Sequence, residues 1–223
     1  MSDINFHPDT HLLMDYSSGS LDRALSISVA VHLHFCKECK ERSLSLSDIG
    51  GQLLSEVEPA SVLSDTLRIV LSRIEDPEYG GESRSSGSFS TASESETLPP
   101  LVKRLLPEQG PDWKFLSPSL RVAKLAVGEQ FKEVALHKIK AGGKTPTHDH
   151  RGQEITVVLK GSFSDDNGVY HEGDFLLKEP GDIHTPVATA NEECICLSVL
   201  AAPIRMVGGF KRLLNPFLSF SPA

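Results

Sequence analysis

The sequence predicts a two-domain protein of the α plus all-β class, in which a small helical unit precedes an all-β domain. Apolar residues recur every four positions between Leu21 and Leu33, the spacing of an amphipathic helix. After residue 100 the pattern changes to short β-rich runs separated by turn residues, typical of a sandwich or barrel. Residues 76–100 hold seven Ser, three Gly and three Pro, with too little apolar surface to offset the entropy of ordering. We therefore predict a helical domain at 1–75, a flexible linker at 76–100 and a β domain at 101–223, with the two domains folding independently.

The composition is that of an ordinary globular protein, with 39% apolar and 23% charged residues. No uncharged apolar run reaches the ~18 residues of a membrane-spanning helix, and the polar N-terminus does not resemble a secretory signal. The net charge is −8, and no basic patch suggests binding to nucleic acid. We expect a cytoplasmic protein without membrane or direct nucleic-acid contacts. Its acidic helical domain suits a basic protein partner.

Four helices are expected before the linker. Their boundaries are marked by capping and breaking residues. The predicted helices open at Asp9 or Thr10, at Ser20, near Cys39 and at Pro59, and Gly50-Gly51 ends the third. Four short helices give a thin core, so a metal, a disulfide or a partner is expected to stabilise this domain.

The helical domain contains the spacing H-x3-C-x2-C at His32, Cys36 and Cys39, about one helical turn between successive residues. Two thiolates and an imidazole are soft ligands that select Zn, and a closed tetrahedral site needs a fourth ligand. A redox C-x2-C is the alternative, but it is expected in a βαβ setting that is absent here. Candidates for the fourth ligand are His7, His11 and His34. We favour His7, which precedes the first helix and can fold back without breaking it.

The β domain matches the first cupin motif, G-x5-H-x-H-x3-E-x6-G, between Gly142 and Gly161. The two histidines of the motif are two residues apart, so they face the same way on a strand. The glutamate can return on the neighbouring strand, and residues 180–184 contain the G-x2-H core of the second motif. These motifs predict a jelly-roll-like cupin β-barrel that holds one metal ion through His148, His150, Glu154 and His184.

Two departures from the second motif leave these ligands intact but weaken any inference about catalysis. The proline lies one place late after Gly173, and Ala188 stands where the motif has Asn. No catalytic residue is therefore predicted. Three His and one Glu suit Zn, Fe, Mn, Ni or Cu, so ligand softness alone does not select the ion. The nearby His137 and His171 are interpreted as partly exposed strand residues.

Alternation along the strand predicted at 153–160 gives each side chain a direction. Glu154 must face the metal, so Thr156 and Val158 share its face. The opposite, outward face consists of Ile155, Val157 and Leu159. Three bulky apolar residues on an outward face predict cover by another strand, the helical domain or a second protomer.

Cys194 and Cys196 lie two residues apart on the last predicted strand and so face the same way. They are interpreted either as two small buried apolar side chains or as an oxidisable pair near the metal. The sequence leaves this choice open.

Nearly the whole chain resembles the ChrR-type zinc-binding anti-sigma factors, through the H-x3-C-x2-C helical domain, the linker, the cupin and the strand around Cys194 and Cys196. The resemblance implies a cytoplasmic negative regulator whose N-terminal zinc domain binds an extracytoplasmic-function sigma factor and keeps it from core RNA polymerase. It implies release of that factor under oxidative or photo-oxidative stress. It also implies two Zn ions per chain, one in the cupin and one at His7, His32, Cys36 and Cys39. The cupin ion could instead be Fe, Mn or Ni.

No short motif marks a sigma-binding surface. From the pattern, the best candidate is the apolar face of the fourth helix, which could enter a partner's groove or pack on the other helices. This face consists of Leu63, Leu67, Val70, Leu71 and Ile74. The competing function is a metal-dependent cupin enzyme of the dioxygenase or isomerase type with a helical regulatory domain. The sequence does not decide between a monomer and a homodimer.

Overall fold

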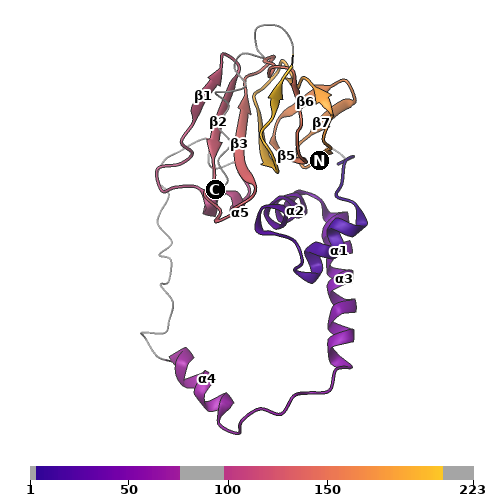
Figure 1. Ribbon diagram of the computed structural model, residues 1–223, viewed down its shortest axis with the longest axis vertical. Coiled ribbons are helices and arrows are strands. Elements are labelled where there is room, and N and C mark those ends of the chain that lie inside the picture. Colours follow the sequence, from indigo (N-terminus) through magenta and orange to yellow (C-terminus); the bar gives the residue numbers. More distant parts are fainter. Residues whose placement is uncertain (1–3, 76–97, 208–223) are drawn as a thin grey trace.

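The computed structural model describes residues 4–75 and 98–207 (Figure 1). The helices in these ranges are α1 (Thr10–Ser18), α2 (Arg23–Phe35), α3 (Lys37–Ser55), α4 (Thr66–Glu75) and α5 (Pro100–Leu105). Residues 76–97 of the predicted linker lie outside the described part. The end of the predicted linker is folded, because Leu98 is buried and α5 begins at Pro100.

The first two helices begin at aspartate caps. Asp9 accepts a hydrogen bond from Leu12 N, and Gly19 closes α1 with a φ of 75°. The cap of α2 is Asp22 rather than the predicted Ser20. The chain therefore makes a short turn between α1 and α2 before the second helix starts.

The other two helices of this unit depart further from prediction. The sequence predicts an end at Gly50-Gly51, but α3 continues to Ser55. A glycine costs about 1 kcal/mol in a helix and does not forbid it, so the good helix formers that follow, Gln52, Leu53 and Leu54, can carry the helix through. α4 begins at Thr66, several residues after the predicted opening at Pro59.

Three antiparallel sheets form the described β domain. The largest has the strand order β1-β2-β3-β11-β5-β8, and the smaller two have the orders β10-β6-β7 and β12-β4-β9. The strands predicted at 153–160 and around Cys194 and Cys196 both belong to the largest sheet, as β5 and β11. The strands are β1 (Lys114–Ser117), β2 (Leu120–Lys124), β3 (Glu133–Ile139), β4 (His148–Asp149), β5 (Glu154–Lys160), β6 (Ser162–Asp165), β7 (Gly168–His171), β8 (Phe175–Lys178), β9 (Ile183–His184), β10 (Val187–Ala188), β11 (Cys194–Leu200) and β12 (Arg205–Met206).

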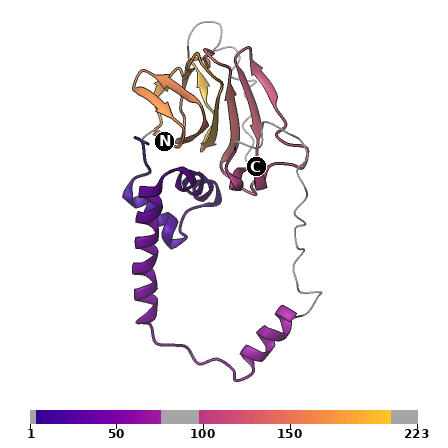
Figure 2. The same ribbon diagram turned by 180° about the vertical axis from the view of Figure 1, so that it is seen from behind.

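The largest sheet is apolar on both faces. On the inner face, Val158 and Cys196 pack with Phe163 and Tyr170 of the β6–β7 hairpin. The opposite face joins a second core that includes α1, α2 and α5. The molecule thus has a helical layer, a large sheet and smaller sheets beyond it (Figures 1 and 2).

The outward residues of β5 are covered by the helical domain, one of the three alternatives predicted for them. Ile155, Val157 and Leu159 are at most 3% exposed and share one core with α2. Burying each such side chain stabilises the fold by roughly 1.5–3 kcal/mol. Each unit therefore buries its apolar face against the other, an arrangement that argues against the prediction of two independently folding domains.

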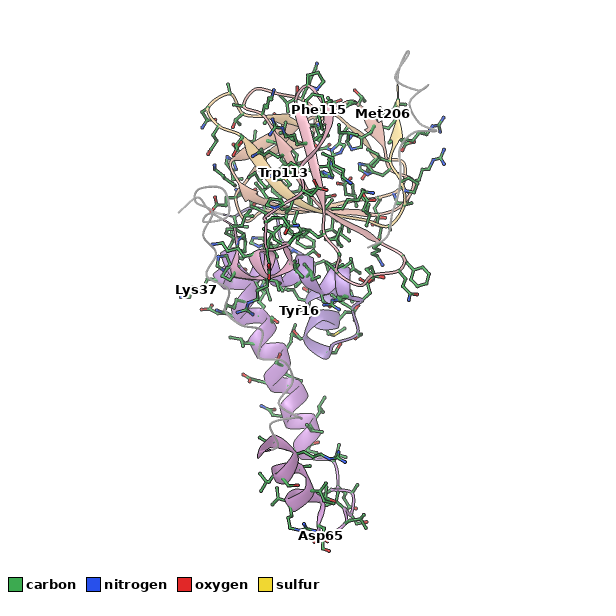
Figure 3. The ribbon with its side chains drawn as sticks, turned by 90° about the vertical axis from the view of Figure 1, so that its left-hand side faces the viewer. Tyr16, Lys37, Asp65, Trp113, Phe115 and Met206 are labelled. Atoms are coloured by element: carbon green, nitrogen blue, oxygen red, sulfur yellow. The ribbon has the colours of Figure 1, made fainter. Side chains whose placement is uncertain are left out.

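The distal half of α3 and the whole of α4 extend away from this packed body (Figure 3). The predicted stripe on α4 is exposed instead of packing on the other helices. Its exposed fractions range from 47% for Val70 to 81% for Leu63, which was predicted on this helix but lies before α4 begins at Thr66. The same arm exposes apolar residues of α3 and of the following segment: Leu44, Ile49, Leu53, Leu54 and Val57.

Candidate metal centres

The first cluster forms where α2 meets α3. His32 lies in the last turn of α2, Cys36 separates the two helices and Cys39 lies in the first turn of α3. His7 reaches the cluster from the segment before α1, with Nδ1 at 3.4 Å from each of the two Sγ atoms. One ligand atom from each of these four residues lies within 4.8 Å of the others. Tetrahedral Zn, with Zn–S of about 2.3 Å and Zn–N of about 2.0 Å, fits such a set.

His32 is oriented toward this cluster by a single hydrogen bond. Its Nδ1 lies 2.7 Å from Gly173 O, which can only accept, so Nδ1 carries the proton. The buried Nε2 makes no hydrogen bond in the described structure and keeps its lone pair. Burial lowers the pKa of His32 to about 4. A neutral imidazole with one nitrogen fixed and the other free is the usual state of a metal ligand.

Burial also raises the pKa of the Cys39 thiol. The hydrogen bond to Cys36 and the charge of Cys36 act in the same direction, and together with burial they raise this pKa to about 12. Without a cation, the Cys39 thiol therefore stays protonated at neutral pH, and metal binding has to displace its proton. The alternatives His11 and His34 are exposed and lie outside the cluster.

The second cluster lies inside the β domain. Its residues are His148 on β4, Glu154 on β5, His184 on β9 and His150 just after β4, and all four are buried. One ligand atom from each lies within 4.8 Å of the others. Antiparallel pairing places His148 directly opposite His184. The structure thus brings together all four residues that the two cupin motifs predict.

The tautomers of His148 and His184 favour binding of a cation between their rings. His148 Nδ1 donates to Pro146 O at 2.9 Å, and His184 Nδ1 donates to Asp165 Oδ2 at 3.0 Å. In the neutral rings both Nε2 atoms are therefore unprotonated, yet they lie 3.0 Å apart. Burial lowers the pKa of both imidazoles, that of His184 to about 4, so protonation is disfavoured at neutral pH. A metal ion can accept both lone pairs and remove this repulsion.

Glu154 contributes the only carboxylate among the four residues. Its Oε1 accepts hydrogen bonds from Ser198 Oγ at 2.7 Å and from Thr156 Oγ1 at 3.2 Å. Its Oε2 is buried and lies 3.0 Å from His150 Nδ1. Burial would raise the pKa of Glu154, but the neighbouring imidazoles, His150 foremost, hold it below its ordinary value. An ionised carboxylate with one oxygen held by hydroxyl groups and the other directed at the imidazole cluster suits metal ligation.

A cavity of about 240 Å³ opens beside this cluster. His137 on β3 is partly exposed, as predicted, and lines this cavity together with apolar side chains of β2, β3 and β6. Cys196 lines the cavity as well, and its Sγ lies 3.6 Å from that of Cys194. The hydrogen bond between these thiols and their burial raise the pKa of Cys196. Both cysteines face the inner core, which favours protonated, weakly nucleophilic thiols.

Three comparisons place the chain among known proteins. Residues 107–202 match the family model described as the ChrR cupin-like domain. The chain is 32% identical to the anti-sigma-E factor ChrR of Cereibacter sphaeroides, over 96% of its own length and 98% of the relative's. The chain belongs to the ChrR family. A crystal structure of Rhodobacter sphaeroides SigE in complex with the anti-sigma ChrR contains a ChrR-family chain that is 30% identical, with a TM-score of 0.74 over 89% of this chain and 100% of the other.

Membership in the ChrR family confirms the predicted fold class, a helical unit followed by a cupin. It also confirms the prediction of a regulator rather than a metal-dependent enzyme. Both clusters have the residue types and distances for metal binding. In the described part of the chain, no helix is long and apolar enough to span a membrane.

Two residues that hold side chains of the cupin cluster in place are not predicted from the sequence. Asp165 ends β6, and Ser198 shares the inward face of β11 with the two cysteines. Strand alternation could have identified Ser198. Asp165 holds His184 from 19 positions away, and no local pattern signals such a contact.

Proposed function

We propose that this chain is an anti-sigma factor that binds an extracytoplasmic-function sigma factor and keeps it from core RNA polymerase. The observation that carries this proposal is the similarity, over 89% of the chain, to a ChrR-family protein crystallised with SigE. The relative that covers 96% of the chain is itself named an anti-sigma factor. Both similarities include the helical unit as well as the cupin.

The exposed arm supplies a surface for this partner. Leu63 and Leu67 are 81% and 69% exposed, and Leu54 at the end of α3 is 72% exposed. Apolar side chains exposed along two helices mark a protein-binding surface, because leaving them in water is unfavourable. We assign the sigma-binding surface to the α4 stripe predicted from sequence, extended by the distal half of α3.

We propose Zn at both clusters, bound by His7, His32, Cys36 and Cys39 in one and by His148, His150, Glu154 and His184 in the other. The first set contains two thiolates, which favour Zn, and stabilises the base of the arm. The second would also accept Fe, Mn or Ni. In this proposal the cupin adjusts release of the sigma factor under oxidative or photo-oxidative stress.

The proposed organisation is an anti-sigma domain at 1–75, a linker and a cupin domain at 101–223, acting in the cytoplasm without contacting nucleic acid or membrane. Co-expression with the cognate sigma factor tests the function, and a stable complex that co-purifies is the expected result. A folded, metal-loaded protein that never retains the sigma factor would contradict it.

A further inference from the structure

The segment that carries His7 is attached to the β domain. Asn5 N and Phe6 N donate to Asp174 Oδ1 at 2.8 and 3.1 Å. Phe175 N donates to Phe6 O at 2.9 Å. Asp174 is fully buried, and its second oxygen accepts from the backbone of the turn between β7 and β8. Three hydrogen bonds thus hold the chain immediately before His7 against the β domain.

The same turn fixes a second residue of the N-terminal cluster. Gly173 O accepts the hydrogen bond that orients His32. Gly173 has a φ of 92°, and a Cβ there would lie 2.6 Å from Ile4 and 2.9 Å from Phe35. Only glycine allows the N-terminal segment and the end of α2 to approach the turn this closely. Two consecutive residues of the β domain therefore position two residues of the helical cluster.

We propose that the β7–β8 turn is a structural part of the N-terminal metal site and that Asp174 is its positioning residue. This inference rests on the N-terminal metal site proposed above, but it does not depend on sigma-factor binding. Cys36 and Cys39 are fixed within the helical unit, where both are buried. His7 is exposed and lies outside any helix or strand, so its place near the thiols depends on the contacts to Asp174.

The turn is also connected to the cupin cluster. Tyr170 on β7 donates to Asp165 Oδ1 at 2.9 Å, and Asp165 holds His184. The Tyr170 ring packs edge-on against Phe6, with centroids 4.8 Å apart. Packed side chains thus extend from a cupin ligand to the residue next to His7. These contacts join the two clusters by a route that does not include residues 76–97.

Release of Co²⁺ from the full-length protein tests the role of Asp174. Of the two clusters, only the N-terminal one contains Cys ligands, so the thiolate-to-cobalt charge-transfer band reports that site alone. In excess chelator, Asp174→Asn should lose the band at least about tenfold faster than the wild type, the usual range for groups that orient a metal ligand. Phe6→Ala, a change at a partly exposed residue, should accelerate the loss in the same direction.

Two variants serve as controls. Asp182 is an exposed carboxylate of the β domain that accepts one backbone hydrogen bond from Glu179, and Asp182→Asn should leave the band unchanged. Lys132 pairs with Asp22 across the same two units but away from the cluster, so Lys132→Met should also have little effect. Loss of the band at the wild-type rate in both Asp174→Asn and Phe6→Ala would overturn the inference. An equally fast loss of the band in Lys132→Met would also overturn it. A wild-type protein without the band would overturn the metal site itself.

Discussion

At the residue scale, the chemistry of both clusters depends on which imidazole nitrogen carries the proton. Backbone carbonyls fix this choice for His32 and His148, and the Asp165 carboxylate fixes it for His184. In each case Nδ1 donates and Nε2 keeps its lone pair. The protein thus prepares its ligands before a metal arrives, which lowers the reorganisation needed for binding.

Replacing Asp165 should weaken the cupin site specifically. In Asp165→Asn the negative charge is lost and the preferred tautomer of His184 is no longer enforced. We expect metal affinity to fall roughly 10–100-fold, measured by chelator competition. Asp166→Asn, at the exposed carboxylate next in sequence, is the matched control and should bind like the wild type. Equal affinities in both variants would rule out the role assigned to Asp165.

Without metal, acid should destabilise the protein well above the pKa of its carboxylates. His32 and His184 have pKa values of about 4 in the folded state, lowered mainly by burial from 6.5. Between these pH values the unfolded chain binds more protons than the folded one, so the free energy of unfolding falls as pH falls. At about 1.4 kcal/mol per pKa unit, the loss is on the order of several kcal/mol. Urea unfolding of the metal-free protein from pH 6.5 to 4 measures it, and a flat profile would contradict these shifts.

At the element scale, α3 and α4 combine a buried base with an exposed arm. The base is fixed by the N-terminal cluster, whereas the arm has few contacts and many exposed apolar side chains. Stability in the described helices is therefore uneven, highest near α2 and lowest toward α4. Such an arm can adjust to a partner at little cost to the rest of the fold.

The apolar stripe of α4 should matter for binding and not for folding. We expect Leu67→Glu with Leu71→Glu to abolish binding of the cognate sigma factor, because both charges would be buried in the complex. The free energy of unfolding should change by less than about 0.5 kcal/mol, since both side chains are exposed. Ser72→Glu, on the opposite face of α4, should bind normally. Calorimetry and thermal melts check both points, and unchanged affinity in the double variant would exclude this surface.

How much could be predicted from the sequence differs from element to element. The direction of every side chain in β5 follows from Glu154, because a strand has a fixed period of two. The end of α3 does not follow from Gly50-Gly51, because glycine in a helix is a small cost that neighbouring residues offset. Asp174 could not be recognised, because its partners lie up to 169 positions away along the chain.

At the scale of the whole molecule, the two domains share a core, and the β domain donates and accepts hydrogen bonds beside the N-terminal candidate metal cluster. α2 buries one face against β5 and β11, and the β7–β8 turn holds His7 and His32 in place. This arrangement differs from the predicted one, in which a flexible linker joins two independently folding domains. The cupin contacts the helical unit directly.

Cutting the chain between the domains should therefore leave them together. With a protease site inserted between residues 76 and 97, we expect the two fragments to co-elute in gel filtration after cleavage. Separation would expose Ile155, Val157 and Leu159 to water, and this exposure costs roughly 1.5–3 kcal/mol of free energy for each side chain. Replacing Val157 by Asp provides the dissociated control. Fragments that separate without this substitution would restore the prediction of independent domains.

The most direct test of the proposed function is transcription with purified components. Core RNA polymerase and the cognate extracytoplasmic-function sigma factor are mixed on a promoter that this factor recognises, and the metal-loaded chain is added in increasing amounts. We predict that transcription stops near one chain per sigma factor, and that Cys36→Ser with Cys39→Ser removes the inhibition. Transcription that continues unchanged in an excess of folded, metal-loaded protein would contradict the assignment as an anti-sigma factor.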